Sequence, residues 1–174
     1  MFCCFIVMAT LERAIEIARE AHRGQVDKAG CDYIGHPLRV MAAGRNTAEK
    51  IAGVLHDVVE ESSWTFAMLQ AEGFASEIIE ALRCLTRNDG ESYDGYISRV
   101  KGNALAVAVK LNDLADNMDV RRLPVLAEKD VERLKRYHIA YMTLAGHHHA
   151  GAVPDGELPW DSDDSELSQM YNGG

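Results

Sequence analysis

The chain has 174 residues, of which 47% are hydrophobic and only 4 are proline, a composition that fits one globular domain rich in helix. Its net charge of −9 gives it no basic surface for binding a nucleic acid. The four cysteines lack CxxC spacing, which favours the reducing cytoplasm, and the apolar start of the chain is too short to span a membrane.

The hydrophobic pattern predicts helices along most of the chain. An amphipathic stripe indicates a first helix from Thr10 to His22, with Thr10 as its N-cap. A loop with three glycines follows over residues 23–35, and Pro37 begins a short second helix that ends near Gly44. Further helices are expected at residues 47–59, 64–70, 76–85, 93–100, 103–119 and 131–145. We therefore expect an all-α bundle of about seven to eight helices.

The chain divides into three segments by composition. An apolar N-terminal extension covers residues 1–9, and the expected domain covers residues 10–153. Residues 154–174 contain six acidic side chains and neither lysine nor arginine, which indicates a flexible acidic tail.

The predicted helix at residues 47–59 is apolar enough for the core, yet it leads into a group of charged side chains. On a helix, Glu60 lies four residues after His56 and three after Asp57, so these side chains share a face. Glu61 lies four residues after Asp57. Acids crowded on one face of a buried helix repel one another and lose their hydration. A bound cation would offset both costs, so this segment predicts a metal site.

Two other residues supply further donors for such an ion. His36 precedes the rigid Pro37, and Asp113 lies in the apolar helix predicted at residues 103–119. Two imidazoles and two carboxylates suit Mn²⁺, Fe²⁺ or Zn²⁺ better than Ca²⁺, which prefers oxygen ligands. Lys110 is a candidate counter-charge for phosphate, and the apolar surroundings favour this role over a local ion pair with Asp113, which would be worth about 0.2–0.5 kcal/mol.

These residues, in this order, resemble the HD superfamily of metal-dependent phosphohydrolases, whose ligands follow an H…HD…D pattern. The surrounding residues resemble the SpoT/Rel-type alarmone hydrolases in particular. The resemblance covers about residues 10–145 and rests on AHRGQVDKAG at 21–30, YIGHP at 33–37, LHDVVEE at 55–61, VKLND at 109–113 and NM at 117–118. It implies a stand-alone small alarmone hydrolase with the HD-type helical fold.

The resemblance also implies an activity and a role for each site residue. The expected reaction is metal-dependent removal of the 3′-diphosphate of guanosine tetra- or pentaphosphate, with release of pyrophosphate, and the expected metal is Mn²⁺. The partner is thus a small nucleotide, and an assembly of identical subunits stays open. The implied assignments are His36, His56, Asp57 and Asp113 to the metal, Glu60 and Glu61 to the catalytic water, and Lys28, Asn117, Arg133 and Tyr137 to the substrate.

Four positions depart from the family pattern. Asp27 replaces an arginine, Glu61 replaces an aspartate, Leu114 replaces an arginine and Asp116 replaces a histidine. None of these changes removes a metal ligand, but those near the substrate leave the base open, so ppApp or pppApp is as eligible as ppGpp or pppGpp. Two other functions also stay open: hydrolysis of another nucleotide, as a 5′-nucleotidase or phosphodiesterase, and an alarmone sensor that has lost catalysis.

Overall fold

The computed structural model describes residues 9–123 and 125–146. In that part of the chain it contains eight α-helices and one short 3₁₀-helix, and its only strand-like pairing is a single bridge between Val26 and Asp32. The all-α fold class is therefore confirmed. The helices are α1 (Leu11–Ala21), α2 (Gly35–Ala43), α3 (Thr47–Leu55), α4 (Phe66–Ala71), α5 (Ser76–Leu85), α6 (Tyr93–Lys101), α7 (Ala104–Asn117), η1 (Val120–Arg122) and α8 (Glu128–Leu144).

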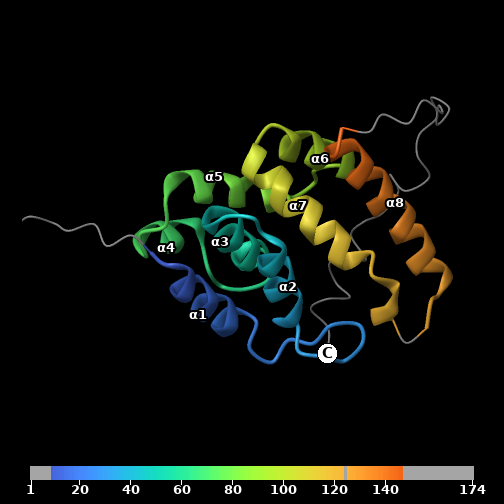
Figure 1. Ribbon diagram of the computed structural model, residues 1–174, viewed down its shortest axis with the longest axis horizontal. Coiled ribbons are helices and arrows are strands. Elements are labelled where there is room, and N and C mark those ends of the chain that lie inside the picture. The colour runs from blue at the N-terminus through green and yellow to red at the C-terminus, as the bar shows by residue number, and fades with distance from the viewer. Residues whose placement is uncertain (1–8, 124, 147–174) are drawn as a thin grey trace, which may run out of the picture.

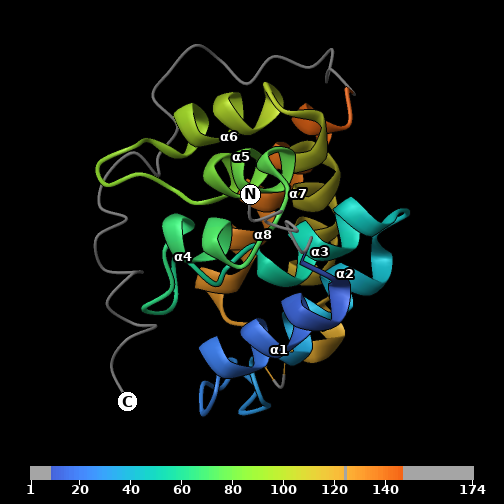
Figure 2. The same ribbon diagram turned by 90° about the vertical axis from the view of Figure 1, so that its left-hand side faces the viewer.

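Helix α3 lies at the centre of the bundle and packs against α1, α2, α5 and α7 (Figure 1). Helix α7 joins the two halves of the molecule, since it also contacts α6 and α8; the view turned by 90° shows α8 behind it (Figure 2). The core between these helices consists of aliphatic side chains that are fully buried, among them Ile17, Val54, Leu55, Leu82 and Val109. Burying this apolar surface is the main force that holds the helices around α3.

Side-chain caps explain where several helices begin. The side chains of Thr10, Asn46, Thr65, Ser92 and Asn103 each accept a hydrogen bond from the backbone N–H three residues later. Each bond satisfies a donor that the first turn of a helix leaves without an internal partner. The N-cap predicted at Thr10 is therefore confirmed.

A glycine lets α2 and α3 approach each other closely. A Cβ atom on Gly53 would lie 3.3 Å from the backbone N and Cα atoms of Met41 on α2, which is tighter than side chains normally tolerate. This close packing brings the first turn of α2, with His36, toward the end of α3, with His56. A small residue in the middle of α3 thus helps to position the candidate site.

Several helix ends differ from the sequence prediction by one to four residues, and two of them lie at the site. Helix α3 ends at Leu55 instead of Val59, and the residues after it form turns. The His56 imidazole Nδ1 donates to the Gly53 carbonyl at 2.8 Å and so takes the acceptor that a continuing helix would offer to the next backbone N–H. Helix α2 begins at Gly35, so Pro37 lies within its first turn, where its missing N–H costs nothing.

The predicted segment borders fall largely outside the described residues. This holds for residues 1–8 of the expected N-terminal extension, for the end of the expected domain beyond residue 146, and for the acidic tail at residues 154–174. None of the described helices combines the length and the apolar character needed to cross a membrane.

Candidate functional site

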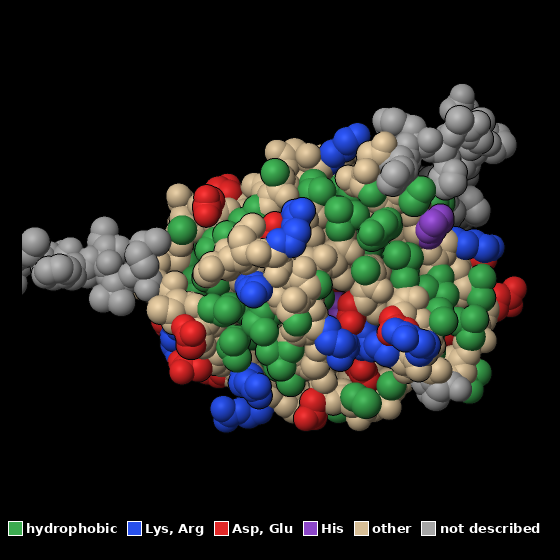
Figure 3. All heavy atoms as spheres, in the orientation of Figure 1, with side chains coloured by type: hydrophobic (Ala, Val, Ile, Leu, Met, Phe, Trp, Pro, Cys, Tyr) green, Lys and Arg blue, Asp and Glu red, His purple; other side chains and the backbone are tan. Residues whose placement is uncertain are grey.

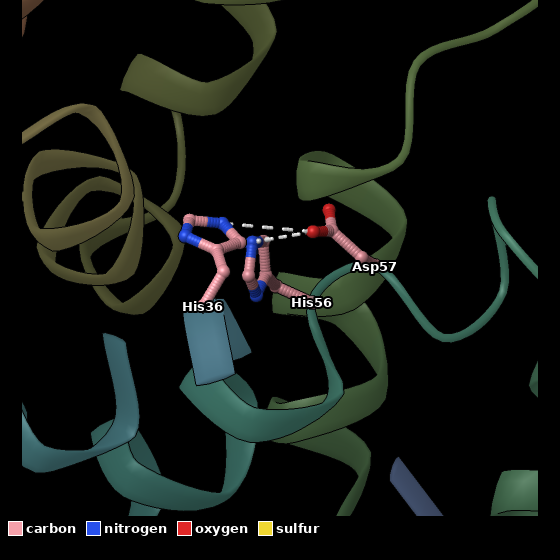
Figure 4. A group of neighbouring side chains, drawn as sticks. All are labelled: His36, His56 and Asp57. Atoms are coloured by element: carbon pink, nitrogen blue, oxygen red, sulfur yellow. Dashed lines mark ion pairs between the residues drawn. The ribbon is translucent and has the colours of Figure 1, made fainter. Parts of the chain in front are cut away.

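Three of the predicted metal ligands meet at one point between α2 and the end of α3. His36 comes from the first turn of α2, whereas His56 and Asp57 follow α3 directly. One ligand atom from each residue lies within 4.8 Å of the others, and the three side chains point toward one another (Figure 4). Both histidines are buried, and Asp57 is half-buried. Such a compact group of nitrogen and oxygen donors could hold a metal ion.

The fourth predicted ligand reaches the same place from α7. Asp113 is buried, and its Oδ1 atom lies 3.1 Å from His36 Nε2 and 3.6 Å from His56 Nε2. Donors from α2, α3 and α7 therefore converge, although 77 residues separate the first from the last along the chain (113 − 36 = 77). We call His36, His56, Asp57 and Asp113 the candidate metal centre, or metal centre for short, from here on.

Both imidazoles present the same nitrogen to this centre. His56 Nδ1 donates to the Gly53 carbonyl at 2.8 Å, and His36 Nδ1 donates a hydrogen bond to the Asp116 carboxylate at 2.7 Å. Each ring is thereby left with Nε2 facing the other donors. His56 Nε2 is fully buried without a well-aligned hydrogen bond, and its neighbours are carboxylate oxygens, Asp57 Oδ2 at 3.0 Å and Asp113 Oδ1 at 3.6 Å, an arrangement that a bound cation would complete. The donor set therefore fits a divalent transition metal.

The two carboxylates of the metal centre are also held by neighbouring groups. The Tyr33 hydroxyl donates to Asp57 Oδ2 at 2.6 Å. Asn117 Nδ2 donates to Asp113 Oδ1 at 2.6 Å, and the Lys110 ammonium lies 2.8 Å from Asp113 Oδ2. Such outer partners orient metal ligands and fix their charge. Lys110 and Asn117 therefore both contact Asp113, a predicted metal ligand, although the sequence prediction assigned Asn117 to the substrate.

The local charges keep the carboxylates ionised. Burial by itself would raise the pKa of the Asp113 carboxyl, but Lys110 and the two imidazoles outweigh it and hold that pKa well below its ordinary value. Burial also acts against the charged form of His56, yet the neighbouring carboxylates raise the pKa of its imidazole well above the ordinary value. The two carboxylates of the centre are thus anionic, and Lys110 and the imidazoles balance their charge. A divalent cation would add further positive charge when bound.

The metal centre opens into a cavity that contains most of the other predicted site residues. Glu60 and Glu61 line it shortly after Asp57 in the chain, Lys28 lines it from the loop after α1, and Arg133 and Tyr137 line it from α8. Every predicted site residue except the buried His56 lines this cavity. Burial, then the charges of Asp57 and Glu60, raise the pKa of the Glu61 carboxyl to about 7. A carboxyl with that pKa can accept a proton near neutral pH.

Sequence reasoning missed three contributors to the site. Tyr33 was part of a motif but had no assigned role, and Asp116 appeared only as a departure from the family pattern. Asp116 lies three residues after Asp113 and therefore on the same face of α7, a spacing that could have indicated it. Arg122 lines the cavity from η1 and ion-pairs with Asp27 at 3.0 Å. Because Arg122 lies beyond the end of α7, no helical spacing from Asp113 could have indicated it.

No family model matches the chain, but comparisons with known proteins find relatives that are named as ppGpp 3′-pyrophosphohydrolases or as GTP pyrophosphokinases. A guanosine-3′,5′-bis(diphosphate) 3′-pyrophosphohydrolase of Aquifex aeolicus is 30% identical over 77% of this chain and 20% of its own length. A GTP pyrophosphokinase of Streptomyces coelicolor is 29% identical over 92% of this chain and 20% of its own length. The chain thus spans about a fifth of the length of these relatives.

A solved structure shares the fold. It belongs to a metazoan ortholog of SpoT that hydrolyzes ppGpp, and it superposes with a TM-score of 0.63. The match covers 86% of this chain and 90% of that chain at 18% sequence identity. The helical arrangement around α3 and α7 is therefore shared with that ortholog.

Proposed function

Because this chain belongs to the SpoT/Rel-type family of HD-domain proteins, we propose that it hydrolyses the 3′-diphosphate of a purine alarmone. The substrate is ppGpp or pppGpp, or the adenosine analogue ppApp or pppApp. Water adds to the phosphorus next to the 3′ oxygen, the bond between them breaks, and the nucleoside 5′-di- or triphosphate and pyrophosphate leave. The observation that carries this proposal is the convergence of four metal donors beside Glu61 in one cavity.

The metal in this proposal is Mn²⁺, held by His36, His56, Asp57 and Asp113. The mixed nitrogen and oxygen donor set supports Mn²⁺ or a neighbouring transition metal over Ca²⁺. When bound, such an ion would lower the pKa of a water molecule and balance negative charge on the phosphoryl oxygens.

The glutamates handle the water. Glu61 lines the cavity half-buried, and its pKa of about 7 allows it to exist as a base at neutral pH and to carry a proton afterwards. Glu60 is the second carboxylate on the same wall of the cavity, where the backbone N–H of Arg87 donates to its Oε2 atom at 3.3 Å. Glu60 is thereby held in place to orient the water for Glu61.

The residues that line the cavity from the loop after α1 and from α8 bind the nucleotide. Lys28, Arg133 and Tyr137 offer two cations and one aromatic ring there, which suits phosphate groups and a purine. Asn117 can contact the substrate with the atoms that its bond to Asp113 leaves available. The proposal places this reaction in the cytoplasm, on a free nucleotide.

Turnover of paired substrates tests the proposal. Purified protein is incubated with ppGpp and, separately, ppApp, with Mn²⁺, with Zn²⁺ and with EDTA, and pyrophosphate is measured. We expect release from at least one substrate with Mn²⁺, none with EDTA, and none from Glu61→Gln. Glu77→Gln, an exposed glutamate on α5, is the matched control and should keep full activity.

Two results would redirect the proposal. A product that keeps its 3′-diphosphate would identify a phosphohydrolase that acts elsewhere on the nucleotide, such as a 5′-nucleotidase or a phosphodiesterase. Tight alarmone binding without turnover under every metal would identify a sensor. Either result contradicts 3′-pyrophosphohydrolase activity.

A further inference from the structure

Asp116 pairs with two arginines, whereas no carboxylate of the metal centre has more than one lysine or arginine partner among the described residues. Its side chain is 11% exposed, and His36 Nδ1 lies 2.7 Å from its Oδ2 atom. Arg39 donates to both carboxylate oxygens, at 2.6 Å to Oδ1 and 3.1 Å to Oδ2. Arg122 donates to Oδ2 at 2.5 Å. One carboxylate thus joins a metal ligand on α2 to two arginines, one on α2 and one on η1.

These contacts determine which nitrogen of His36 can bind a metal. A carboxylate between two guanidinium groups is ionised, and an ionised carboxylate only accepts hydrogen bonds. The proton between Asp116 and His36 therefore belongs to Nδ1. The nitrogen left for a ligand is Nε2, which lies 3.1 Å from Asp113 Oδ1 and 3.7 Å from Asp57 Oδ2. The ring is fixed both in its protonation and in its direction.

We propose that Asp116 is a positioning residue that aims His36 Nε2 at the metal, and that Arg39 and Arg122 hold Asp116 in place for this task. The proposal rests on the metal centre of the proposed function but not on its substrate. A carboxylate on the outer nitrogen of a metal-binding histidine typically strengthens metal binding 10- to 100-fold. Asp116 therefore sets the metal affinity of this chain without contacting the ion.

Arg122 also links Asp116 to the loop after α1. Arg122 Nη2 donates to Asp27 Oδ2 at 3.0 Å, while Asp27 Oδ1 accepts the backbone N–H groups of Ala29 and Cys31. Acidic and basic side chains gather on this face of the molecule, where the loop approaches the segment after α7 (Figure 3). Asp27 thus restrains the guanidinium that supports Asp116.

A plain ion-pair role for Asp116 makes a different prediction. An ion pair that only joins α2 to η1 would change the stability of the fold and leave the metal affinity of the folded protein unaltered. A positioning role changes the affinity even where the fold remains intact. The two roles are separated by measuring metal binding and melting on the same variants.

The experiment measures Mn²⁺ affinity by isothermal titration calorimetry on the full chain, without nucleotide. The variants are Asp116→Ala, Asp116→Asn and the double variant Arg39→Gln with Asp116→Asn, which keeps the charge of the cluster equal to that of the unmodified chain. Glu72→Gln is the matched control, because Glu72 also accepts two bonds from one arginine, Arg13, each at 2.8 Å, on a distant surface. Melting in EDTA and the visible spectrum of bound Co²⁺ accompany each titration.

We expect about 10- to 100-fold weaker Mn²⁺ binding in Asp116→Ala, a smaller loss in Asp116→Asn, and no change in Glu72→Gln. The double variant should remain weak, and the Co²⁺ spectrum of the Asp116 variants should change. If Asp116→Ala fails to fold, Asp116→Asn carries the test, since it keeps the size of the side chain.

Three results would overturn the proposal. The first is unchanged Mn²⁺ affinity in both Asp116 variants. The second is recovery of affinity in the double variant, which would show that net charge alone had mattered. The third is an unmodified chain that binds no metal, which would overturn the metal centre as well. A chain whose Mn²⁺ affinity depends on Asp116 but that hydrolyses no alarmone would contradict the proposed function and support this inference.

Discussion

The metal centre and the rim of its cavity are built in different ways. At the metal centre, each of the four donors is oriented by another group of the protein, and three of the four are buried. At the rim, Lys28 is exposed, and the two arginines form ion pairs, Arg122 with Asp27 and Arg133 with Asp130. A short side chain that a neighbouring group holds has few positions, whereas a long exposed one such as Lys28 has many. The centre should therefore fix the chemistry, and the rim should adjust substrate affinity.

Removing a ligand should produce the largest effect. In His56→Ala the buried Nε2 donor is lost, and we expect the rate constant kcat to fall by at least about a thousandfold, because metal catalysis supplies several kcal/mol. The measurement is pyrophosphate release under saturating Mn²⁺ and alarmone. His138→Ala, an exposed histidine on α8, is the control and should retain its rate. A His56→Ala variant within tenfold of the control would place the metal elsewhere.

Removing an outer partner of a ligand should have an intermediate effect. Tyr33→Phe deletes the hydroxyl that donates to Asp57 at 2.6 Å and leaves the ring in place. We expect Mn²⁺ affinity to fall about tenfold or more, with little change in melting temperature. Tyr141→Phe, on α8 and away from the cavity lining, serves for comparison. Equal affinities in the two variants would mean that Tyr33 does not support the centre.

The titration of Glu61 sharpens the comparison in a different way. In the metal-free protein its carboxyl should titrate near 7, since burial and the charges of Asp57 and Glu60 disfavour the ionised form. Carbon-13 NMR of the side-chain carboxyl measures this pKa directly. In Asp57→Asn the pKa should fall, because a nearby negative charge is lost. Bound Mn²⁺ should also lower the pKa of Glu61, because a nearby positive charge favours the ionised carboxylate. An ordinary glutamate pKa in the metal-free protein would remove the argument for Glu61 as the base.

A rim substitution should have the smallest effect, and it should act on KM. Arg133→Ala removes a cation that lines the cavity from α8, and we expect KM for the alarmone to rise about tenfold while kcat changes little. Lys135→Ala, an exposed cation on the same helix, should match the unmodified chain. A loss confined to kcat would show that Arg133 acts on the transition state, and the contrast between centre and rim would then be wrong.

The sequence predicted the helices and the converging donors for identifiable physical reasons. Helix starts such as Thr10 and Asn103 follow from local capping chemistry, which needs no knowledge of the fold. The donors could be predicted because adjacent His56 and Asp57 in an apolar segment are costly without a ligand. Their assignment to a metal is still a proposal, although the structure brings all four together.

Other features could not be predicted because they depend on contacts across the fold. The end of α3 at Leu55 depends on the His56 imidazole, which bonds to Gly53, and hydrophobic periodicity does not register such a bond. The pairing of Asp27 with Arg122 joins residues 95 positions apart, so no local pattern could indicate it. Asp27 replaces a cation of the family, and this replacement did not indicate that Arg122 of η1 would pair with Asp27 and line the same cavity.

The most direct measurement is anomalous X-ray diffraction from crystals of the full chain grown with Mn²⁺. A single manganese peak should appear within about 2.0–2.3 Å of His36 Nε2, His56 Nε2 and carboxylate oxygens of Asp57 and Asp113, the usual distances for such ligands. A peak bound elsewhere, or a well-ordered centre without manganese at saturating concentration, would contradict the account.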